Sequence, residues 1–139
     1  MERTETKIIN CREEMPAVVA MVEGFGIAHG IPAHVVNEIN VALDEVLSNI
    51  ISYGYGPEER GEIHIRLAHR PGEILAEVED TGRPFDPMQA PPPELPATLQ
   101  ARRIGGLGIH FIKSLADEVR YMRAGGKNRL QLRKRLASG

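Results

Sequence analysis

The stretch "ALDEVLSNIISYGYG", Ala42 to Gly56, carries the pattern that decides the fold. It completes a helix predicted from Pro32 to about Tyr53, ended by glycines. The apolar residues of this helix recur at three- and four-residue spacing and form one buried stripe: Ile39, Ala42, Leu43, Val46, Leu47 and Ile50. The stripe predicts a helix that packs on another layer through one face.

Two polar side chains border that stripe. Glu45 and Asn49 are four residues apart, so they lie one turn apart on the same side of the helix. A carboxamide oxygen is a ligand for hard metal ions, and a neighbouring carboxylate can accept a proton. A solvated helix flank explains the same two residues, so the pair alone does not decide its own role.

The other segments predict a sheet and one more helix. Residues 62–67 and 73–79 alternate between apolar and polar on either side of Pro71-Gly72, which is typical of an antiparallel hairpin with one polar face. A second predicted hairpin joins strands at 119–123 and 129–136 and turns at Gly125-Gly126. The remaining predicted elements are an edge strand at 4–10 and a helix at 13–29. We therefore expect an α/β two-layer sandwich, with helices on one face of a mainly antiparallel mixed sheet.

Asp80 ends the second strand of the first hairpin. It lies on the same face as Ile74, Ala76 and Val78, so it points toward the helix layer, where a carboxylate needs a hydrogen-bonding partner. Gly82 follows in "DTG" and leaves room for a ligand to approach. A turn aspartate that caps its own backbone is the alternative interpretation.

A proline-rich loop and a glycine cluster follow. Residues 82–98 hold six of the ten prolines, which exclude a regular helix or central strand and are typical of a functional or disordered loop. "GGLGIHFIKSLAD", 105–117, places three glycines before a helix, where free N–H groups form an anion site. No Gly-Lys-Ser/Thr follows, so this is not a Walker-type loop, and the strand-first context of a dinucleotide fold is missing.

Taken together, these motifs resemble the GHKL ATPase superfamily, whose Bergerat fold is shared by gyrase B, MutL and histidine kinase catalytic domains. Within it the chain is similar to the anti-sigma-factor serine kinases of the RsbW and SpoIIAB type. The resemblance covers nearly the whole chain and is closest in "DEVLSNIISYGY", "DTGRPFDP" and "GGLGIHFIKSLADEVRY". It implies one domain over residues 1–139, with an ATP lid at about 82–104.

The resemblance also implies site roles and cofactors. Asn49 would coordinate Mg²⁺ at the phosphates of ATP, and Asp80 would accept the adenine amino group. Gly82 would let the base approach, and Glu45 would act as general base. The remaining implied nucleotide contacts are Phe85, Gly105, Gly106, Leu107, Gly108, Ile109 and His110.

Two departures from the family pattern stand out. Arg83-Pro84 follows Gly82 where many members have a second glycine, which stiffens the start of the lid. Gln131 falls in the last strand where many members have a threonine near adenine. Either change is expected to weaken nucleotide affinity without removing a residue that the chemistry requires.

The implied function is regulatory phosphoryl transfer. The resemblance implies a homodimer that sequesters a sigma factor and phosphorylates a serine of a STAS-type antagonist. A non-catalytic ATP-binding module that switches partners is the alternative. A histidine kinase fragment fits less well, because it needs a preceding helical hairpin with a phospho-accepting histidine and only 31 residues precede Pro32.

Length and composition limit the number of domains, the classes of partner and the cell compartment that we expect. A chain of 139 residues suits one domain, and a net charge of −2 does not favour nucleic acid or an anionic membrane as partner. Cys11 is the single cysteine, so no internal disulfide forms. No apolar run approaches the roughly 20 residues of a membrane span, and the charged N-terminus lacks a signal-peptide core. We expect a cytoplasmic protein.

Overall fold

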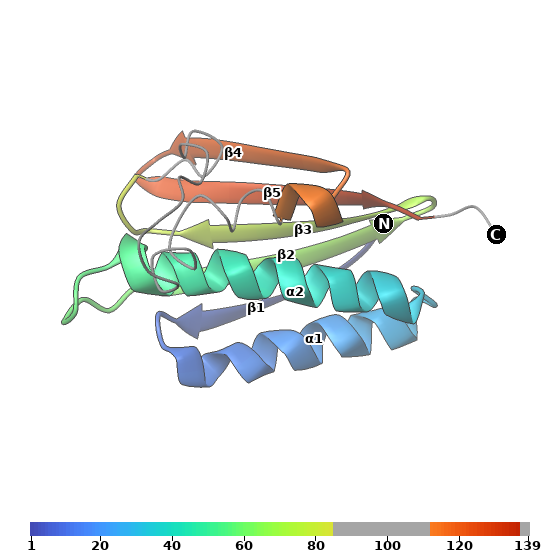
Figure 1. The fold of residues 1–139 in the computed structure, drawn as a ribbon, viewed down its shortest axis with the longest axis horizontal. Coiled ribbons are helices and arrows are strands. Elements are labelled where there is room, and N and C mark those ends of the chain that lie inside the picture. The colour runs from blue at the N-terminus through green and yellow to red at the C-terminus, as the bar shows by residue number, and fades with distance from the viewer. Residues whose placement is uncertain (85–111, 137–139) are drawn as a thin grey trace, which may run out of the picture.

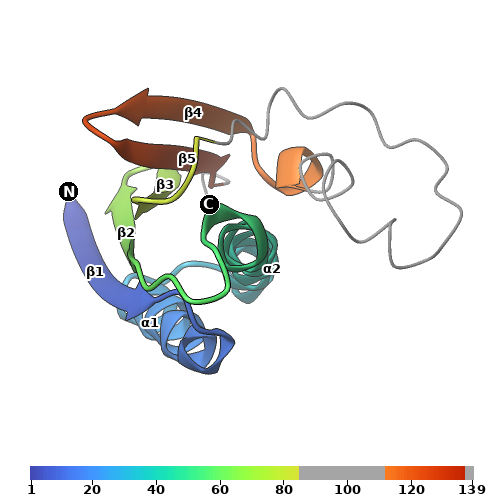
Figure 2. The ribbon, with the colours of Figure 1, turned by 90° about the vertical axis from the view of Figure 1, so that its left-hand side faces the viewer.

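The computed structural model describes residues 1–84 and 112–136. Two long helices lie on one face of a five-stranded sheet (Figures 1 and 2). The elements are β1 (Glu2–Ile9), α1 (Met15–Ala28), α2 (Ala33–Asn49), β2 (Glu62–Arg70), β3 (Glu73–Asp80), β4 (Glu118–Ala124) and β5 (Lys127–Arg135), with a 3-10 turn η1 (Arg12–Glu14) and a π-helical turn η2 (Ile50–Gly54). Residues 112–115 are also helical.

The strands follow the order β1-β2-β3-β5-β4, and each neighbouring pair is antiparallel. The predicted α/β two-layer sandwich is confirmed. The expected mixed sheet is corrected in one respect, because every neighbouring pair among the described strands is antiparallel. Both predicted hairpins form where glycines supply positive φ angles, at +84° for Gly72 and at +60° and +75° for Gly125 and Gly126.

The core forms between the stripe of α2 and the helix-facing side of the sheet. The strand register places Ile65, Val78 and Leu130 directly across from one another, in the three central strands. Leu43 and Leu47 of α2 are each only 1% exposed and belong to the same apolar cluster. Full burial of each such side chain stabilises the fold by about 1.5–3 kcal/mol, so this layer contact holds the two halves together.

The second helix departs from its prediction at one point. Its α-helical part ends at Asn49, four residues before the expected end, and η2 continues the chain as a π-helical turn to Gly54. Such wide turns often occur at functional sites. The change in helix type falls directly after Asn49.

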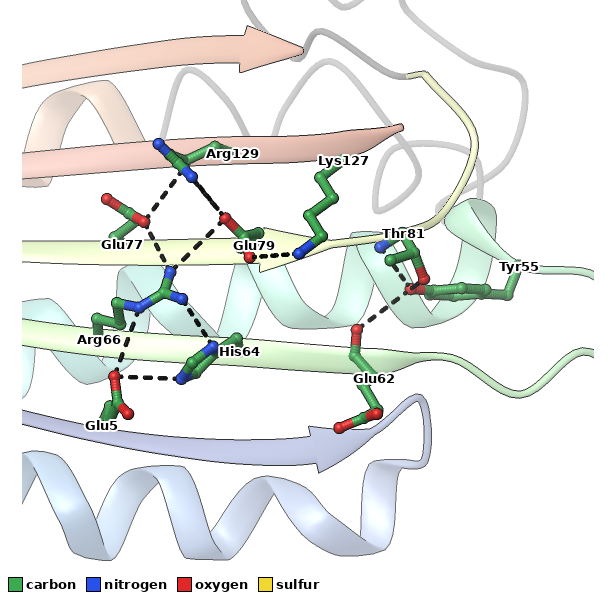
Figure 3. Close-up of polar contacts among 10 residues, drawn as sticks. All are labelled: Glu5, Tyr55, Glu62, His64, Arg66, Glu77, Glu79, Thr81, Lys127 and Arg129. Atoms are coloured by element: carbon green, nitrogen blue, oxygen red, sulfur yellow. Dashed lines mark hydrogen bonds and ion pairs between the residues drawn. The ribbon is translucent and has the colours of Figure 1, made fainter. Parts of the chain in front are cut away.

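The opposite face of the sheet is covered by charged side chains instead of helices. Figure 3 shows Arg66 between Glu5 and Glu77, and Arg129 between Glu77 and Glu79. These ion pairs explain the polar half of the alternating strand pattern. Within residues 1–84 and 112–136, none of the helices combines the length and the hydropathy needed to cross a membrane.

Candidate functional site

Asp80 lies where β3 ends, on the helix-facing side of the sheet, and is only 4% exposed. Its Oδ1 accepts hydrogen bonds from the Gly82 N–H at 2.8 Å and from Asn128 Nδ2 at 3.1 Å. Its Oδ2 forms no hydrogen bond with any described residue. The backbone-capping interpretation is therefore correct for one carboxylate oxygen, and the other oxygen keeps its acceptor capacity.

Burial raises the pKa of the Asp80 carboxyl above its ordinary value. The two hydrogen bonds to Oδ1 and the positive charge of Arg123 oppose this shift, but the loss of solvent around the carboxylate outweighs them. A buried carboxylate with a perturbed pKa and a free oxygen is a common feature of functional sites.

Asn128 fastens the turn after Asp80, and the sequence analysis missed it. It stands opposite Asp80 in the strand register. Its Nδ2 donates to the Arg83 carbonyl at 2.8 Å as well as to Asp80, and its Oδ1 accepts from Tyr121 Oη and from Arg123 Nη1, the latter at 3.1 Å. One signal was available: Asn128 alternates with inward-facing leucines, at a position where an apolar residue is expected.

Gly82 is packed against the end of η2. A Cβ at this position would lie 2.6 Å from the carbonyl oxygen of Gly54 and 2.9 Å from Asp80 Oδ1. The next residue, Arg83, donates its N–H to the same Gly54 carbonyl at 2.9 Å. Gly82 therefore serves the docking of this turn on η2, a role that the sequence did not indicate.

Tyr55 makes the second contact between these two segments. Its hydroxyl lies 3.0 Å from the Thr81 backbone nitrogen, which donates to it, and 3.5 Å from the Glu62 carbonyl (Figure 3). The side chain is only 8% exposed. Tyr55 therefore links the end of η2 to the end of β3, and with Gly82 it fixes Asp80 relative to η2.

A small cleft that is open to solvent lies beside Asp80. Its lining comes from α2, the end of β3, the 112–115 helix and the last hairpin: Val46, Asn49, Ile50, Asp80, Ile112, Tyr121, Asn128 and Leu130. Mostly apolar walls with a few polar groups are the usual composition of a small-molecule site. The Asn49 carboxamide has no hydrogen-bond partner among the described residues, so it is available to a ligand.

The other predicted site residues either do not line this cleft or lie outside the described residues. Glu45 is half-buried one turn before Asn49, and it is not among the described residues that line the cleft. Phe85 and residues 105–110 lie outside the described residues, as does most of the expected lid. Their nucleotide contacts stay predictions.

The placement of Gln131 near adenine is wrong. Gln131 lies on the open face of the sheet, where its Nε2 donates to Glu77 Oε2 at 2.9 Å. Strand residues alternate between the two faces, so Asn128 and Leu130 face the cleft and Gln131 does not. The expected loss of affinity from Gln131 has no structural basis.

A magnesium ion would find few protein ligands here. Residues 1–84 and 112–136 hold no group of three or more His, Cys, Asp or Glu side chains that could bind a metal ion. Asn49 offers a single carboxamide oxygen to the cleft. This fits Mg²⁺, which keeps several waters and commonly takes further ligands from the phosphates of its substrate.

The fold and this cleft can now be compared with known proteins. The model of the histidine kinase-like ATPase domain family matches residues 10–134. The chain belongs to this family. Serine/threonine-protein kinase BtrW of Bordetella bronchiseptica is 31% identical over 94 residues, 68% of this chain and 66% of that protein. Serine-protein kinase RsbW of Listeria innocua is 26% identical over 103 residues, 71% and 66% of the two chains.

Solved structures give the same fold. The RsbU and RsbW domains of Rv1364c from Mycobacterium tuberculosis align with a TM-score of 0.72 at 18% identity, over 100% of this chain and 34% of that one. The histidine kinase domain from Erythrobacter litoralis EL346 aligns with a TM-score of 0.56 over 88% and 61% of the two chains. The chain spans just under two thirds of the length of the two kinases above.

Proposed function

We propose that this protein binds Mg-ATP in the cleft beside Asp80 and transfers the γ-phosphoryl group to a serine of a partner protein. The cleft-lining carboxylate of Asp80, whose Oδ2 has no hydrogen-bond partner among the described residues, is the observation that carries the proposal. An acceptor oxygen on a cleft wall favours a ligand that donates a hydrogen bond, and the amino group of adenine is such a donor. Guanine would present a carbonyl oxygen to the same carboxylate, so the site favours adenine.

The cleft walls support the same ligand. The apolar lining of the cleft comes from Val46 of α2, Ile50 of η2, Leu130 of β5 and Ile112. Apolar walls bury the faces of a base, while the single carboxylate selects its edge. Asn49 lines the same cleft. In this proposal it would hold the metal that accompanies the phosphates.

In this proposal the protein contributes positioning and proton removal. Mg²⁺, when bound, would neutralise charge that develops on the phosphates. Glu45 would take the proton of the attacking serine hydroxyl. The serine oxygen would form a bond to the γ-phosphorus while the bond between the γ-phosphorus and the β-phosphate oxygen breaks, which leaves ADP. Asn49 would hold the metal one helical turn away from Glu45, so a single helix would position both groups.

A second candidate is a non-catalytic module in which ATP supports a partner-binding surface. One observation favours it: Glu45 is not among the described residues that line the cleft. The similarity to the two protein kinases, BtrW and RsbW, favours catalysis instead. The activity of Glu45 variants separates the two candidates.

The proposed partners follow the anti-sigma-factor kinases that the sequence resembles. The protein would sequester a sigma factor and release it when a STAS-type antagonist with an acceptor serine competes for binding. Phosphorylation adds about −1.5 to −2 charges at neutral pH, which would repel the product from the ATP phosphates and Glu45. A cytoplasmic homodimer is part of the same proposal.

The test compares two α2 variants with the wild type. We expect Glu45→Gln to retain ATP affinity and to lose about 10²–10⁴-fold in phosphotransfer to the antagonist, because a general base contributes that much. We expect Asn49→Ala to weaken Mg-ATP binding as well. Calorimetry measures the affinity, and radiolabel transfer from γ-labelled ATP measures the activity.

Asp44→Asn is the matched control, since Asp44 is an exposed carboxylate on the same helix. It should leave binding and transfer unchanged. Wild-type transfer by Glu45→Gln would reject the general base, and ATP binding without any transfer by the wild type would favour the module.

A further inference from the structure

Lys134 is a half-buried cation on the helix-facing side of the sheet. It follows Leu130 and Leu132 in the alternation of β5, and its side chain is only 18% exposed. Its Nζ donates to Glu38 Oε2 at 2.6 Å and to the Leu115 carbonyl at 2.6 Å. One ammonium group therefore joins three elements: β5, α2 and the helix at residues 112–115.

The helix at residues 112–115 depends on β5 for the position of its C-terminal end. The Asp117 N–H donates to the Arg133 carbonyl at 2.9 Å, and the Arg135 N–H donates to Asp117 Oδ2 at 2.6 Å. Lys134 adds a charged donor at the Leu115 carbonyl, where a cation also interacts favourably with the helix dipole. These contacts fix the position of the described C-terminal end of the helix.

Both elements that Lys134 joins to β5 form walls of the cleft. The short helix contributes Ile112, which is 1% exposed, and α2 contributes Val46 and Asn49. Glu38 lies two turns before Val46 on α2. The distance between the two walls is therefore coupled to a contact that lies outside the cleft.

We propose that Lys134 is a positioning residue for nucleotide binding, which holds the Ile112 wall against α2 through Glu38 and the Leu115 carbonyl. This inference rests on the proposed function for its ligand. Loss of the ammonium leaves a carboxylate and a carbonyl without their shared donor, so the 112–115 helix samples other positions. A ligand that needs Ile112 in its position beside α2 then binds more weakly. The loss of affinity follows the fraction of molecules in which the 112–115 helix has left that position.

The experiment uses Lys134→Met, which keeps most of the apolar stem and removes the charge. We expect ATP affinity to fall about 2- to 30-fold, the range typical of residues that act on a site without touching its ligand. Amide hydrogens of residues 113–117 should exchange faster without nucleotide, while those of β2 and β3 should not change. Lys134→Arg should retain most of the wild-type ATP affinity and the slow amide exchange of residues 113–117, because arginine keeps a charged donor at this position.

Arg133→Met is the matched control. Arg133 is the neighbouring cation of β5, ion-paired on the open face with Glu73 at 3.6 Å and Glu118 at 3.4 Å. It should leave ATP affinity and the exchange of residues 113–117 as in the wild type. An equal loss of affinity in Arg133→Met would show a general effect of ion-pair removal and would overturn the inference.

The two proposals fail in different ways. A wild type that binds no nucleotide rejects the proposed function, and slow exchange of residues 113–117 in Lys134→Met then also rejects the role of Lys134. A wild type that binds ATP, with unchanged affinity in Lys134→Met, rejects the role of Lys134 alone. Should Lys134→Met not fold, Glu38→Gln tests the same contact more mildly, with the same expected direction.

Discussion

Glu79 and Asp80 are adjacent carboxylates of β3 with nearly equal burial, 7% and 4% exposed, and they have opposite surroundings. Glu79 points to the open face, where Arg129 Nη2 lies 2.8 Å from its Oε2 and Lys127 Nζ lies 3.6 Å from its Oε1 (Figure 3). Asp80 points to the helix layer and forms no ion pair with a described residue. Burial alone therefore does not determine the state of a carboxylate.

The pKa values of the two groups shift in opposite directions. The hydrogen bond from Arg129 lowers the pKa of Glu79, with help from the charges of Arg66 and Lys127. Loss of solvent raises the pKa of Asp80 despite its two hydrogen bonds. Glu79 already has its counter-charges within the fold, whereas Asp80 Oδ2, on a cleft, has no hydrogen-bond partner among the described residues. The second arrangement is the one expected of a ligand-binding residue.

The largest effect should come from Asp80→Asn in ATP binding. The substitution replaces one carboxylate oxygen by an amide N–H₂, which would face the adenine amino group donor to donor. We expect ATP affinity to fall about 10- to 100-fold, the cost of leaving buried polar groups unpaired. Calorimetry with the wild type, Asp80→Asn and Glu79→Gln measures it.

Glu79→Gln is the control one residue away, and it should change ATP affinity less than about twofold. A large loss in Glu79→Gln would remove the distinction between the two carboxylates. Equal affinity of the wild type for GTP and ATP would reject Asp80 as the residue that selects the base.

A smaller effect is expected from Gly82→Ala. This substitution disturbs the hydrogen bond from the Gly82 N–H to Asp80 Oδ1 and leaves the contacts of Glu79 unchanged. The new Cβ meets the Gly54 backbone, which cannot move aside as a flexible side chain does. We expect a loss of about 1–3 kcal/mol in the free energy of unfolding, as for other overpacked sites. Urea denaturation measures it.

Gly24→Ala is its control, because Gly24 lies on α1 and no atom stands within 4 Å of its Cβ position. This variant should gain about 0.5–1 kcal/mol, the usual benefit of alanine in a helix. A Gly82→Ala protein as stable as the wild type would show that the turn is not docked tightly on η2.

The smallest effect is the pH dependence of stability without nucleotide. The contribution of Asp80, with its raised folded-state pKa, is present below the unfolded pKa of about 3.9 and is lost as pH rises through the folded value. The contribution of Glu79 is present above the unfolded pKa of about 4.3 and is lost as pH falls through its lowered folded value.

The two amide variants should therefore differ in sign at pH 7. Relative to the wild type, Asp80→Asn should be more stable and Glu79→Gln less stable. The Asp80→Asn difference should shrink as pH falls toward about 4, whereas the Glu79→Gln difference should persist to about pH 4 and shrink only at lower pH. Unfolding free energies measured from about pH 7 to below about pH 4 test this. Parallel curves for the two variants would contradict the opposite shifts.

Much of the architecture follows from local patterns in the sequence. Strand alternation predicted both hairpins, and the three- and four-residue spacing in α2 predicted the face that packs on the sheet. Alternation also predicted that Asp80 points to the helix layer, because a strand residue shares its face with the residue two positions before it. These features depend on neighbours along the chain, so the sequence is sufficient to predict them.

Strand bounds limited that reasoning at β5. The predicted strand began at Arg129, which left Asn128 in the turn and outside the site, although it pairs with Asp80 across the sheet. The same alternation, applied from Asn128, places Gln131 on the open face. A family pattern could not correct this, since it assigns a role to a position without showing which way the side chain points.

The tertiary structure alone decided which distant groups meet. Gly82 is needed because the Gly54 carbonyl lies where its Cβ would be, and Lys134 finds Glu38 across 96 residues of sequence. No local pattern encodes these contacts, because they arise only when the sheet and the helix layer pack against each other. The sequence by itself determined the layers, the face of each strand and the inward carboxylate; the packing of the layers determined which oxygen of Asp80 stays free, because only packing brings its donors within hydrogen-bond distance.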